Sequence, residues 1–344
     1  MKPDLWSLYR LMLLSRLLEE AVIGLWEEGL IFGEMHLGTG EEAVVAGVVS
    51  QMTDGDAMAM DHRGTPPMVM RGIDPVLLLK EFLGREDGLC SGMGGHMHLF
   101  SKEHLAASSG IVGSSGPAAV GFALAATLLR QGSLAIAFFG EGALNQGMLL
   151  EALNLAVVWN LPILFICKNN EWATSTHSPS VTGGNPIDRA RSFGMHAIEV
   201  DGSDVEAVWE AARDAMDRAR TDRGPTFLMA HCSHLEGHFL GDPLMRAARH
   251  PIREMAKYAG SMARALTAKG GTSLRERFES LGKIGTLGGR VADQITEVGD
   301  PLEKTRQKFE SEMERLLGLE EGVKREVLLA VDVALGLDGN VETS

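Results

Sequence analysis

Two short polar motifs follow neighbouring apolar runs and could hold a metal ion. Glu141 stands between two glycines after the run LAIAFF, and Asn169 and Asn170 follow closely after the next run, LPILFIC. The interval between the motifs is close to the roughly 30 residues of a strand–helix–strand unit. In a parallel sheet both motifs would lie at one edge, on strands about 4.8 Å apart. Because carboxylate and amide oxygens suit Mg²⁺, the spacing predicts a magnesium site.

The glycines around Glu141 indicate a phosphate beside that metal. Gly140 and Gly142 let the backbone approach a ligand closely. The helix that we predict to begin near Gly147 would direct its N–H groups and the positive end of its dipole at an anion. Taken singly, each motif is more typical of a turn or a helix cap. Together, at matching strand ends, they predict a cradle for a metal and a diphosphate.

The elements that must position these residues alternate regularly along the middle of the chain. We predict buried strands at residues 134–140, 161–170, 196–202 and 225–232. Helices are predicted at 147–160 and at 204–220, the second capped by Asp204. Unbroken apolar strands that alternate with helices predict an α/β fold, with a mostly parallel sheet covered by helices on both faces.

Helical segments are expected at both ends of the chain. Apolar residues recur at helical spacing from residue 4 to 28, and a shorter helix is predicted from about residue 40 to 52. Charged helical segments at 304–317 and 323–336 predict a helical C-terminal extension, residues 266–344, after a main domain of residues 1–265. We expect this extension to dock on a partner. The Gly- and Ser-rich stretch 84–121 forms either loops that approach a ligand or flexible segments, and composition leaves both possibilities open.

Composition and charge narrow the class of partner. The 32 basic and 46 acidic residues give a net charge of −14, which disfavours nucleic acid and anionic membrane surfaces. No apolar stretch approaches the roughly 20 residues of a membrane helix. Cys90, Cys167 and Cys232 are far apart, and no apolar signal region opens the chain. We therefore expect a cytoplasmic protein that binds neither nucleic acid nor a membrane.

Several blocks of the sequence together resemble one family. The Gly-acid-Gly and Asn-Asn motifs are similar to the thiamine-diphosphate-binding motif. The chain resembles the alpha subunit of the thiamine-diphosphate-dependent first component of 2-oxo acid (pyruvate, branched-chain or acetoin) dehydrogenase complexes. The resemblance runs in order from about residue 5 to 260, through the blocks HLGTGEEAVVAG (36–47), DHRGTPPMVMRG (61–72), GGHMH (94–98), GIVGSSGPAAVGFAL (110–124), the segment 138–170 and LEGHFLGDPLMR (235–246).

This resemblance implies a thiamine-diphosphate-binding fold and a role for particular residues. Mg²⁺ would be held by Glu141, the Asn170 side chain and the Trp172 carbonyl. The remaining cofactor contacts would come from residues that bind the diphosphate (Gly142, Ala143, His62, Arg63) and residues that pack on the aminopyrimidine (Gly110, Ile111, Val112). His238 would lie at the cofactor mouth, and His36 near the substrate, as catalytic candidates.

The resemblance also implies a reaction and partners. The enzyme would cleave the carbon–carbon bond next to a carbonyl in a small-molecule 2-oxo acid or acetoin and pass the acyl unit to a lipoyl acyltransferase. The family's activating glutamate belongs to a beta subunit, so the active unit would contain two alpha and two beta chains. We expect this chain alone to be inactive.

Five positions depart from the family pattern. They are Glu141 for the usual Asp, Thr65 for a His, His96 for a Ser, Met93 for a Lys and Glu41 for a Gln. Two other interpretations are therefore kept: a specialised or transketolase-like thiamine-diphosphate enzyme subunit, and a degenerate, non-catalytic partner subunit. His96 and His98 have no third metal ligand nearby in sequence, and we assign no role to His231 or His234.

Overall fold

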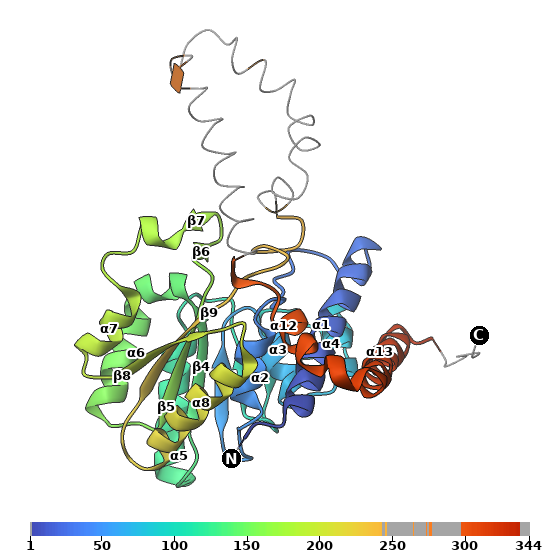
Figure 1. The fold of residues 1–344 in the computed structure, drawn as a ribbon. Coiled ribbons are helices and arrows are strands. Elements are labelled where there is room, and N and C mark those ends of the chain that lie inside the picture. Colours follow the sequence, from blue (N-terminus) through green and yellow to red (C-terminus); the bar gives the residue numbers. More distant parts are fainter. Residues whose placement is uncertain are drawn as a thin grey trace.

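The computed structural model describes residues 2–242 and 297–337, together with the single positions 245, 264, 273, 275 and 276. Seven of its strands form one sheet in the order β2-β3-β1-β4-β5-β9-β8. Figure 1 labels four of them, β4, β5, β9 and β8. The bounds of the seven strands are β1 Ala57–Met60, β2 Phe100–Ser101, β3 Ala106–Ser108, β4 Ala135–Gly140, β5 Ile163–Asn169, β8 His196–Asp201 and β9 Thr226–His231. Within this sheet, only β2 and β3 of the described strands pair antiparallel. The predicted mostly parallel α/β sheet is confirmed.

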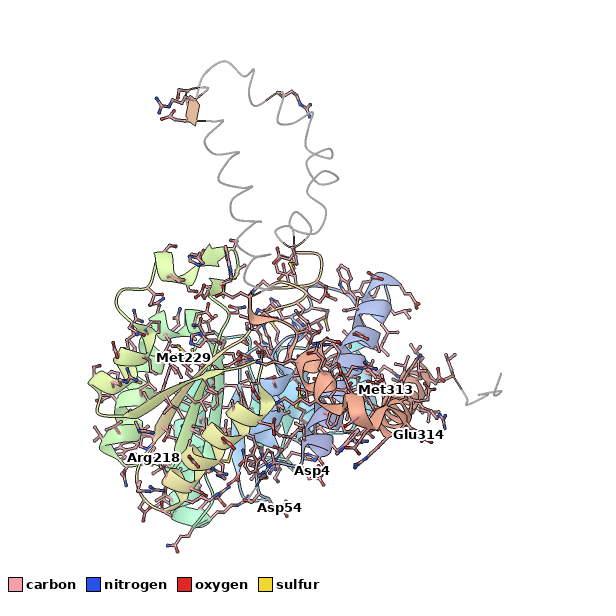
Figure 2. The ribbon with its side chains drawn as sticks, in the orientation of Figure 1. Asp4, Asp54, Arg218, Met229, Met313 and Glu314 are labelled. Atoms are coloured by element: carbon pink, nitrogen blue, oxygen red, sulfur yellow. The ribbon has the colours of Figure 1, made fainter. Side chains whose placement is uncertain are left out.

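The central strands alternate their side chains between two apolar cores. Ile136 and Phe138 of β4 belong to one core, while Ala137 and Phe139 belong to the other. The first core is covered by α1 (Leu5–Glu27), α2 (Glu42–Val49) and α8 (Val205–Arg220), and the second by α5 (Ser115–Leu129), α6 (Gly147–Val158) and α7 (Pro186–Ser192). Met229 of β9, labelled in Figure 2, packs in the second core. Helices therefore cover both faces, as predicted.

The pairing of β4 with β5 places the two polar motifs side by side. These strands are parallel neighbours, with Phe138 opposite Ile166 and Gly140 opposite Lys168. All of β5 and nearly all of β4 are buried, which explains why their sequences are apolar without alternation. Glu141 and Asn170 come next along each strand, so they lie at the same edge of the sheet, as their spacing predicted.

The predicted helix ends are close to the observed ones. Asp4 caps α1 by accepting from the Trp6 and Ser7 N–H groups, and Asp204 caps α8 through Glu206 and Ala207. Two short helices follow β1, namely α3 (Thr65–Met70) and α4 (Pro75–Phe82). None of the described helices is both long and apolar enough to cross a membrane.

The C-terminal segment is helical where the structure describes it. It contains α12 (Pro301–Arg306), a 3₁₀ turn (η3, Gln307–Glu312) and α13 (Met313–Leu335). This segment packs on its own chain, against α1 and α4 (Figure 1), and its docking on a partner stays a prediction. The Tyr9 hydroxyl donates to Glu320 at 2.7 Å, and Arg16 donates to Asp300 at 2.9 Å. The predicted domain boundary at residue 265 lies outside the described residues.

Part of the Gly-rich stretch is a tight loop folded around one buried carboxylate. Glu81, at the end of α4, accepts hydrogen bonds from the backbone N–H groups of Cys90, Gly92 and Gly94 at 2.6, 2.9 and 2.7 Å. A Cβ on Gly94 would lie 2.3 Å from the His98 carbonyl oxygen, so the glycine is required for this close packing. Glu81 therefore holds this part of the stretch in one conformation.

Candidate active site

A cavity of about 360 Å³ opens at the carboxyl ends of the parallel strands. Its walls come from the loop between α1 and α2, the segment before β2 and the loops that follow β1, β3, β4, β5 and β9. The structure brings all of the sequence-predicted site residues to this cavity, namely His36, His62, Arg63, Gly110, Ile111, Val112, Glu141, Gly142, Ala143, Asn170, Trp172 and His238. This is the edge of an open α/β sheet at which ligands bind.

Glu141 is the first residue of a 3₁₀ turn (η1, Glu141–Asn145) that directly follows β4. Its side chain is buried, and it accepts hydrogen bonds from the Ser178 hydroxyl at 2.6 Å and the Asn170 backbone N–H at 3.3 Å. Burial raises the pKa of Glu141 to about 7, although both hydrogen bonds act in the opposite direction. A cation in the cavity would favour the ionised form and take the place of the proton.

Asn170 and Trp172 continue the same wall of the cavity after β5. The Asn170 side-chain oxygen accepts from the Trp172 N–H at 2.9 Å, and its amide nitrogen contacts His234 Nδ1. Glu171 between them is in the left-handed region, with φ 62°, which turns the chain sharply into β6 (Trp172–Ala173). The turn holds the amide of Asn170 and the backbone of Trp172 close to Glu141.

A buried ion cluster lies behind this wall. Lys168 is 1% exposed, and its ammonium donates to Glu41 at 2.7 Å and to Asp61 at 3.1 Å. Burial alone would raise the pKa of Glu41, but Lys168 and His234 lower it below its ordinary value. Glu41 is therefore a carboxylate at neutral pH.

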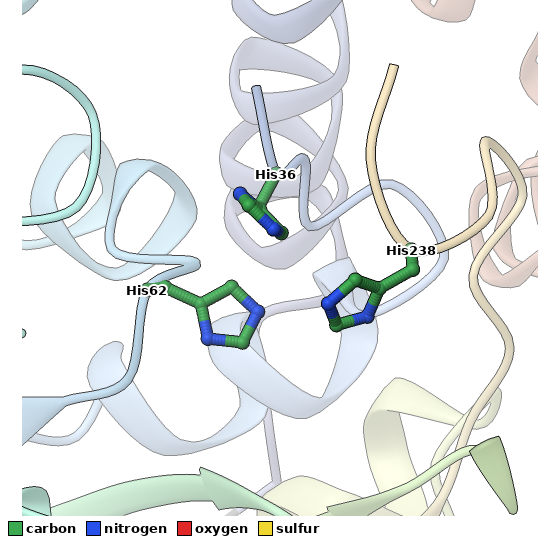
Figure 3. A group of neighbouring side chains, drawn as sticks. All are labelled: His36, His62 and His238. Atoms are coloured by element: carbon green, nitrogen blue, oxygen red, sulfur yellow. The ribbon is translucent and has the colours of Figure 1, made fainter. Parts of the chain in front are cut away.

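Three histidine rings converge on the cavity from different loops (Figure 3). One nitrogen of each of His36, His62 and His238 lies within 4.8 Å of the others, and His96 contacts His36 at 2.9 Å. Burial and then the charge of Arg63 lower the pKa of His36 and His238 to about 3 and that of His96 to about 4, and the same causes hold the pKa of His62 well below its usual range. All four imidazoles are neutral at pH 7.

The charge beside these rings favours an anion over a metal ion. Arg63 is 2% exposed, and it donates to the backbone carbonyls of Leu37 and His238, the second at 2.9 Å. Its guanidinium lies 3.4 Å from His238 Nδ1, where it would repel a cation and attract a phosphate. His62 Nε2 is buried without a hydrogen-bond partner in the part of the chain that the structure describes. Such an atom is suited to a ligand oxygen.

Two further features fit a bound diphosphate cofactor. A Cβ added at Gly142 would lie 2.9 Å from Ala173 Cβ, so only glycine leaves the backbone open at this point. At the edge of the cavity Ile111 and Val112 remain 60% and 51% exposed, an apolar surface on which a ring or another subunit could pack. The Arg63 guanidinium and the buried His62 nitrogen suit a diphosphate, and the Glu141 carboxylate and Asn170 amide of the opposite wall suit Mg²⁺. These groups together match a magnesium diphosphate.

Sequence reasoning missed several residues around the cavity. His234, to which we assigned no role, lines it, as do Asp61 and Glu41. Lys168 and Ser178 stand directly behind the wall. Lys168 had a detectable signal, because a lysine inside the apolar strand LPILFICKNN needs a buried partner.

The positions that depart from the family pattern fall in different surroundings. Glu41 and Glu141 line the cavity, His96 contacts the cavity-lining ring of His36, and Thr65 is buried at the start of α3. Met93 is 88% exposed and does not line the cavity.

Comparison with known proteins identifies what the chain is similar to. The family model described as "Dehydrogenase E1 component" matches residues 9–273. The alpha subunit of acetoin:2,6-dichlorophenolindophenol oxidoreductase from Cupriavidus necator is 41% identical over 243 residues, 70% of this chain and 73% of the relative. The same subunit from Bacillus subtilis is 39% identical over 240 residues, covering 69% and 72%. The alpha subunit of the pyruvate dehydrogenase E1 component from Zymomonas mobilis is 36% identical over 257 residues, covering 74% and 73%.

Proposed function

Because the chain belongs to the dehydrogenase E1 component family, we propose that it is the alpha subunit of a thiamine-diphosphate- and Mg²⁺-dependent dehydrogenase acting on acetoin or a 2-oxo acid. The observation that carries this proposal is the cavity, around which every residue of the family's cofactor pattern gathers at one edge of the sheet. The reaction is cleavage of the carbon–carbon bond next to the substrate carbonyl.

The residues of this chain would bind and orient the cofactor. Glu141, the Asn170 side chain and the Trp172 carbonyl would hold Mg²⁺, which suits their oxygen chemistry. Backbone groups of Gly142 and Ala143 would meet the diphosphate where the chain carries no bulky side chain.

On the opposite wall, Arg63 and His62 would contact the diphosphate oxygens. Arg63 already has its guanidinium held by two backbone carbonyls, so it would meet the anion with little loss of side-chain freedom. His62 offers the buried nitrogen that lacks a partner among the described residues.

The remaining predicted residues would surround the reacting end. Gly110, Ile111 and Val112 would pack on the aminopyrimidine, while His238 and His36 would lie near the substrate carbonyl. When bound, thiamine diphosphate supplies the electron sink for carbon–carbon cleavage. Since both imidazoles are neutral at pH 7, each can donate at one nitrogen and accept at the other.

Partners follow from the same family. The relatives are alpha subunits, and this chain would likewise require a beta subunit to complete its site. The exposed apolar edge at Ile111 and Val112 supports that requirement. We further propose an assembly of two alpha and two beta chains in the cytoplasm, with a separate lipoyl acyltransferase as the acyl acceptor.

The test is reconstitution with the beta subunit. Calorimetry would measure thiamine diphosphate binding with and without Mg²⁺, and reduction of 2,6-dichlorophenolindophenol would report turnover of acetoin, pyruvate and branched-chain 2-oxo acids. We expect saturable Mg²⁺-dependent binding, and turnover only with both subunits. Binding without turnover of any of these substrates would instead identify a non-catalytic subunit, and transfer of two-carbon units between sugar phosphates would identify a transketolase-like enzyme.

A further inference from the structure

A chain of three side chains leads from the buried ion cluster to the predicted metal ligand. His234 Nε2 lies 2.7 Å from Glu41 Oε1, and His234 Nδ1 contacts the Asn170 side-chain nitrogen. The Glu41 side chain is 1% exposed and that of His234 is 12% exposed. The three groups are therefore held in place by their surroundings, and water has little access to the hydrogen bonds between them.

The direction of each hydrogen bond follows from the Lys168 ammonium, which can only donate. It donates to Glu41 Oε2 at 2.7 Å, so Glu41 is an ionised acceptor. A carboxylate accepts and does not donate, so the proton of the His234 ring lies on Nε2. Its Nδ1 then carries a lone pair, and the Asn170 NH₂ group donates to it.

This direction matters because the two ends of an amide have opposite polarity. A turn of 180° about the last side-chain bond of Asn170 exchanges its oxygen with its NH₂ group and presents two hydrogens where a cation needs an oxygen. With the NH₂ group bonded to His234, the oxygen faces the other way, and it accepts from the Trp172 N–H.

We propose that Glu41 and His234 are positioning residues, which fix the amide of Asn170 with its oxygen, and not its nitrogen, toward the bound cation. The proposal rests on the proposed function for the presence of that cation. Neither residue needs to touch the metal or the substrate. Together with the Trp172 N–H, which binds the oxygen, they disfavour one of two nearly isosteric orientations of a ligand.

The first test reads the tautomer of His234 directly. A long-range ¹H–¹⁵N NMR spectrum of the full chain, labelled at histidine and free of metal and cofactor, would show which ring nitrogen carries the proton. The His234→Asn variant identifies the His234 signals by their loss. We expect the proton on Nε2, and a proton on Nδ1 would overturn the proposal.

The second test measures the consequence for metal affinity. Mn²⁺ serves as a spectroscopic probe for Mg²⁺, since both prefer oxygen ligands, and EPR would report free Mn²⁺ in the presence of thiamine diphosphate and the beta subunit. His234→Leu should weaken Mn²⁺ binding about 10-fold or more, as loss of a ligand-orienting partner generally does. His234→Asn, whose oxygen can accept from the Asn170 amide, should recover most of the affinity. His231→Leu is the matched control and should leave it unchanged, because His231 does not line the cavity.

A double variant separates orientation from general support of the loop. Aspartate at position 170 has two equivalent oxygens, so no orientation needs to be chosen. In the Asn170→Asp background, His234→Leu should weaken Mn²⁺ binding by less than about twofold, since the orienting bond has nothing left to select. An equal loss in both backgrounds would overturn the proposal. Absence of Mn²⁺ binding to the unaltered protein would instead contradict the proposed function, and the NMR result would still decide the tautomer.

Discussion

Acidification should weaken metal binding steeply, because Glu141 must lose a proton before it can hold a cation. Burial raises the pKa of this carboxyl from 4.5 to about 7 in the metal-free protein. The Ser178 hydroxyl, 2.6 Å away, favours the ionised form but does not offset the burial. Proton and cation therefore compete for one carboxylate between pH 5 and 8.

The size of the effect follows from the pKa. With a pKa of about 7, the apparent affinity for the cation is about 10-fold lower at pH 6 than well above pH 7, and about 100-fold lower at pH 5.

The pKa of Glu141 also affects folding stability, which changes with pH in the opposite direction. The pKa of Glu141 is higher in the folded chain than in the unfolded chain. As pH rises from 4.5 to 7, the unfolded chain therefore releases the Glu141 proton first. Over this range the unfolding free energy of the metal-free chain falls by about 3 kcal/mol because of Glu141.

The assay is Mn²⁺ binding by EPR from pH 5 to 8.5, with thiamine diphosphate and the beta subunit present. Mn²⁺ bound to thiamine diphosphate alone is measured at each pH and subtracted. Ser178→Ala removes a hydrogen bond to the Glu141 carboxylate, and such a bond stabilises the ionised form by about 1.5 kcal/mol or more. The midpoint of the pH dependence of Mn²⁺ binding should therefore move up by about one pH unit. The control is Ser180→Ala. Ser180 lies in the same 3₁₀ turn as Ser178 (η2, Ser178–Ser180), but its hydroxyl donates to the His177 backbone carbonyl.

Two results would refute this reasoning. One is an affinity that stays constant across the whole pH range, which would mean that Glu141 is already ionised or does not bind the cation. The other is an unchanged midpoint in Ser178→Ala, which would mean that the titrating group is elsewhere.

Three further changes give separate outcomes. Gly142→Ala should weaken thiamine diphosphate binding in calorimetry, because the new Cβ would lie 2.9 Å from that of Ala173, whereas Gly147→Ala meets no atom within 4 Å and should bind normally. Burial raises the pKa of Glu19 to about 8, so the unaltered chain should lose stability between pH 4.5 and 8, whereas Glu19→Gln carries no proton to lose. In urea titrations the unfolding free energy of the variant, minus that of the unaltered chain, should therefore increase over this range. A constant difference would contradict this. Arg63→Lys should lower both the melting temperature and the cofactor affinity, because an ammonium group cannot donate to both backbone carbonyls in the geometry of the guanidinium. An unchanged melting temperature would show that those two hydrogen bonds contribute little to stability.

The local parts of the site were predictable from the sequence. Glu141 and Asn170 follow two consecutive apolar strands, and parallel strands joined by one helix are commonly neighbours in the sheet. The order of apolar strands and the helix between them therefore predicted the edge at which both residues lie.

The long-range parts of the site were not predictable in this way. Lys168 pairs with Glu41 and Asp61 from 127 and 107 positions away, and no local pattern joins them. His231 and His234 look alike in sequence, yet the path of the loop after β9 places only His234 on the cavity. Such pairings depend on how the loops cross the strand ends, which hydrophobic periodicity does not encode.

The contact between the first and last described helices has a consequence for synthesis. The Trp6 and Phe309 rings pack in a tilted arrangement with centroids 3.9 Å apart, and the Tyr9 hydroxyl donates to Glu320, so one covering element of α1 comes about 300 residues later in the chain. At about 5 to 20 residues per second, translation separates them by roughly 15 to 60 s. During that time the part of α1 that the C-terminal segment covers would be exposed, and a chaperone could bind it, although α2 and α3 can already pack on the rest of the helix. The packing of α13 on α1 is thus expected only after α13 has been synthesised.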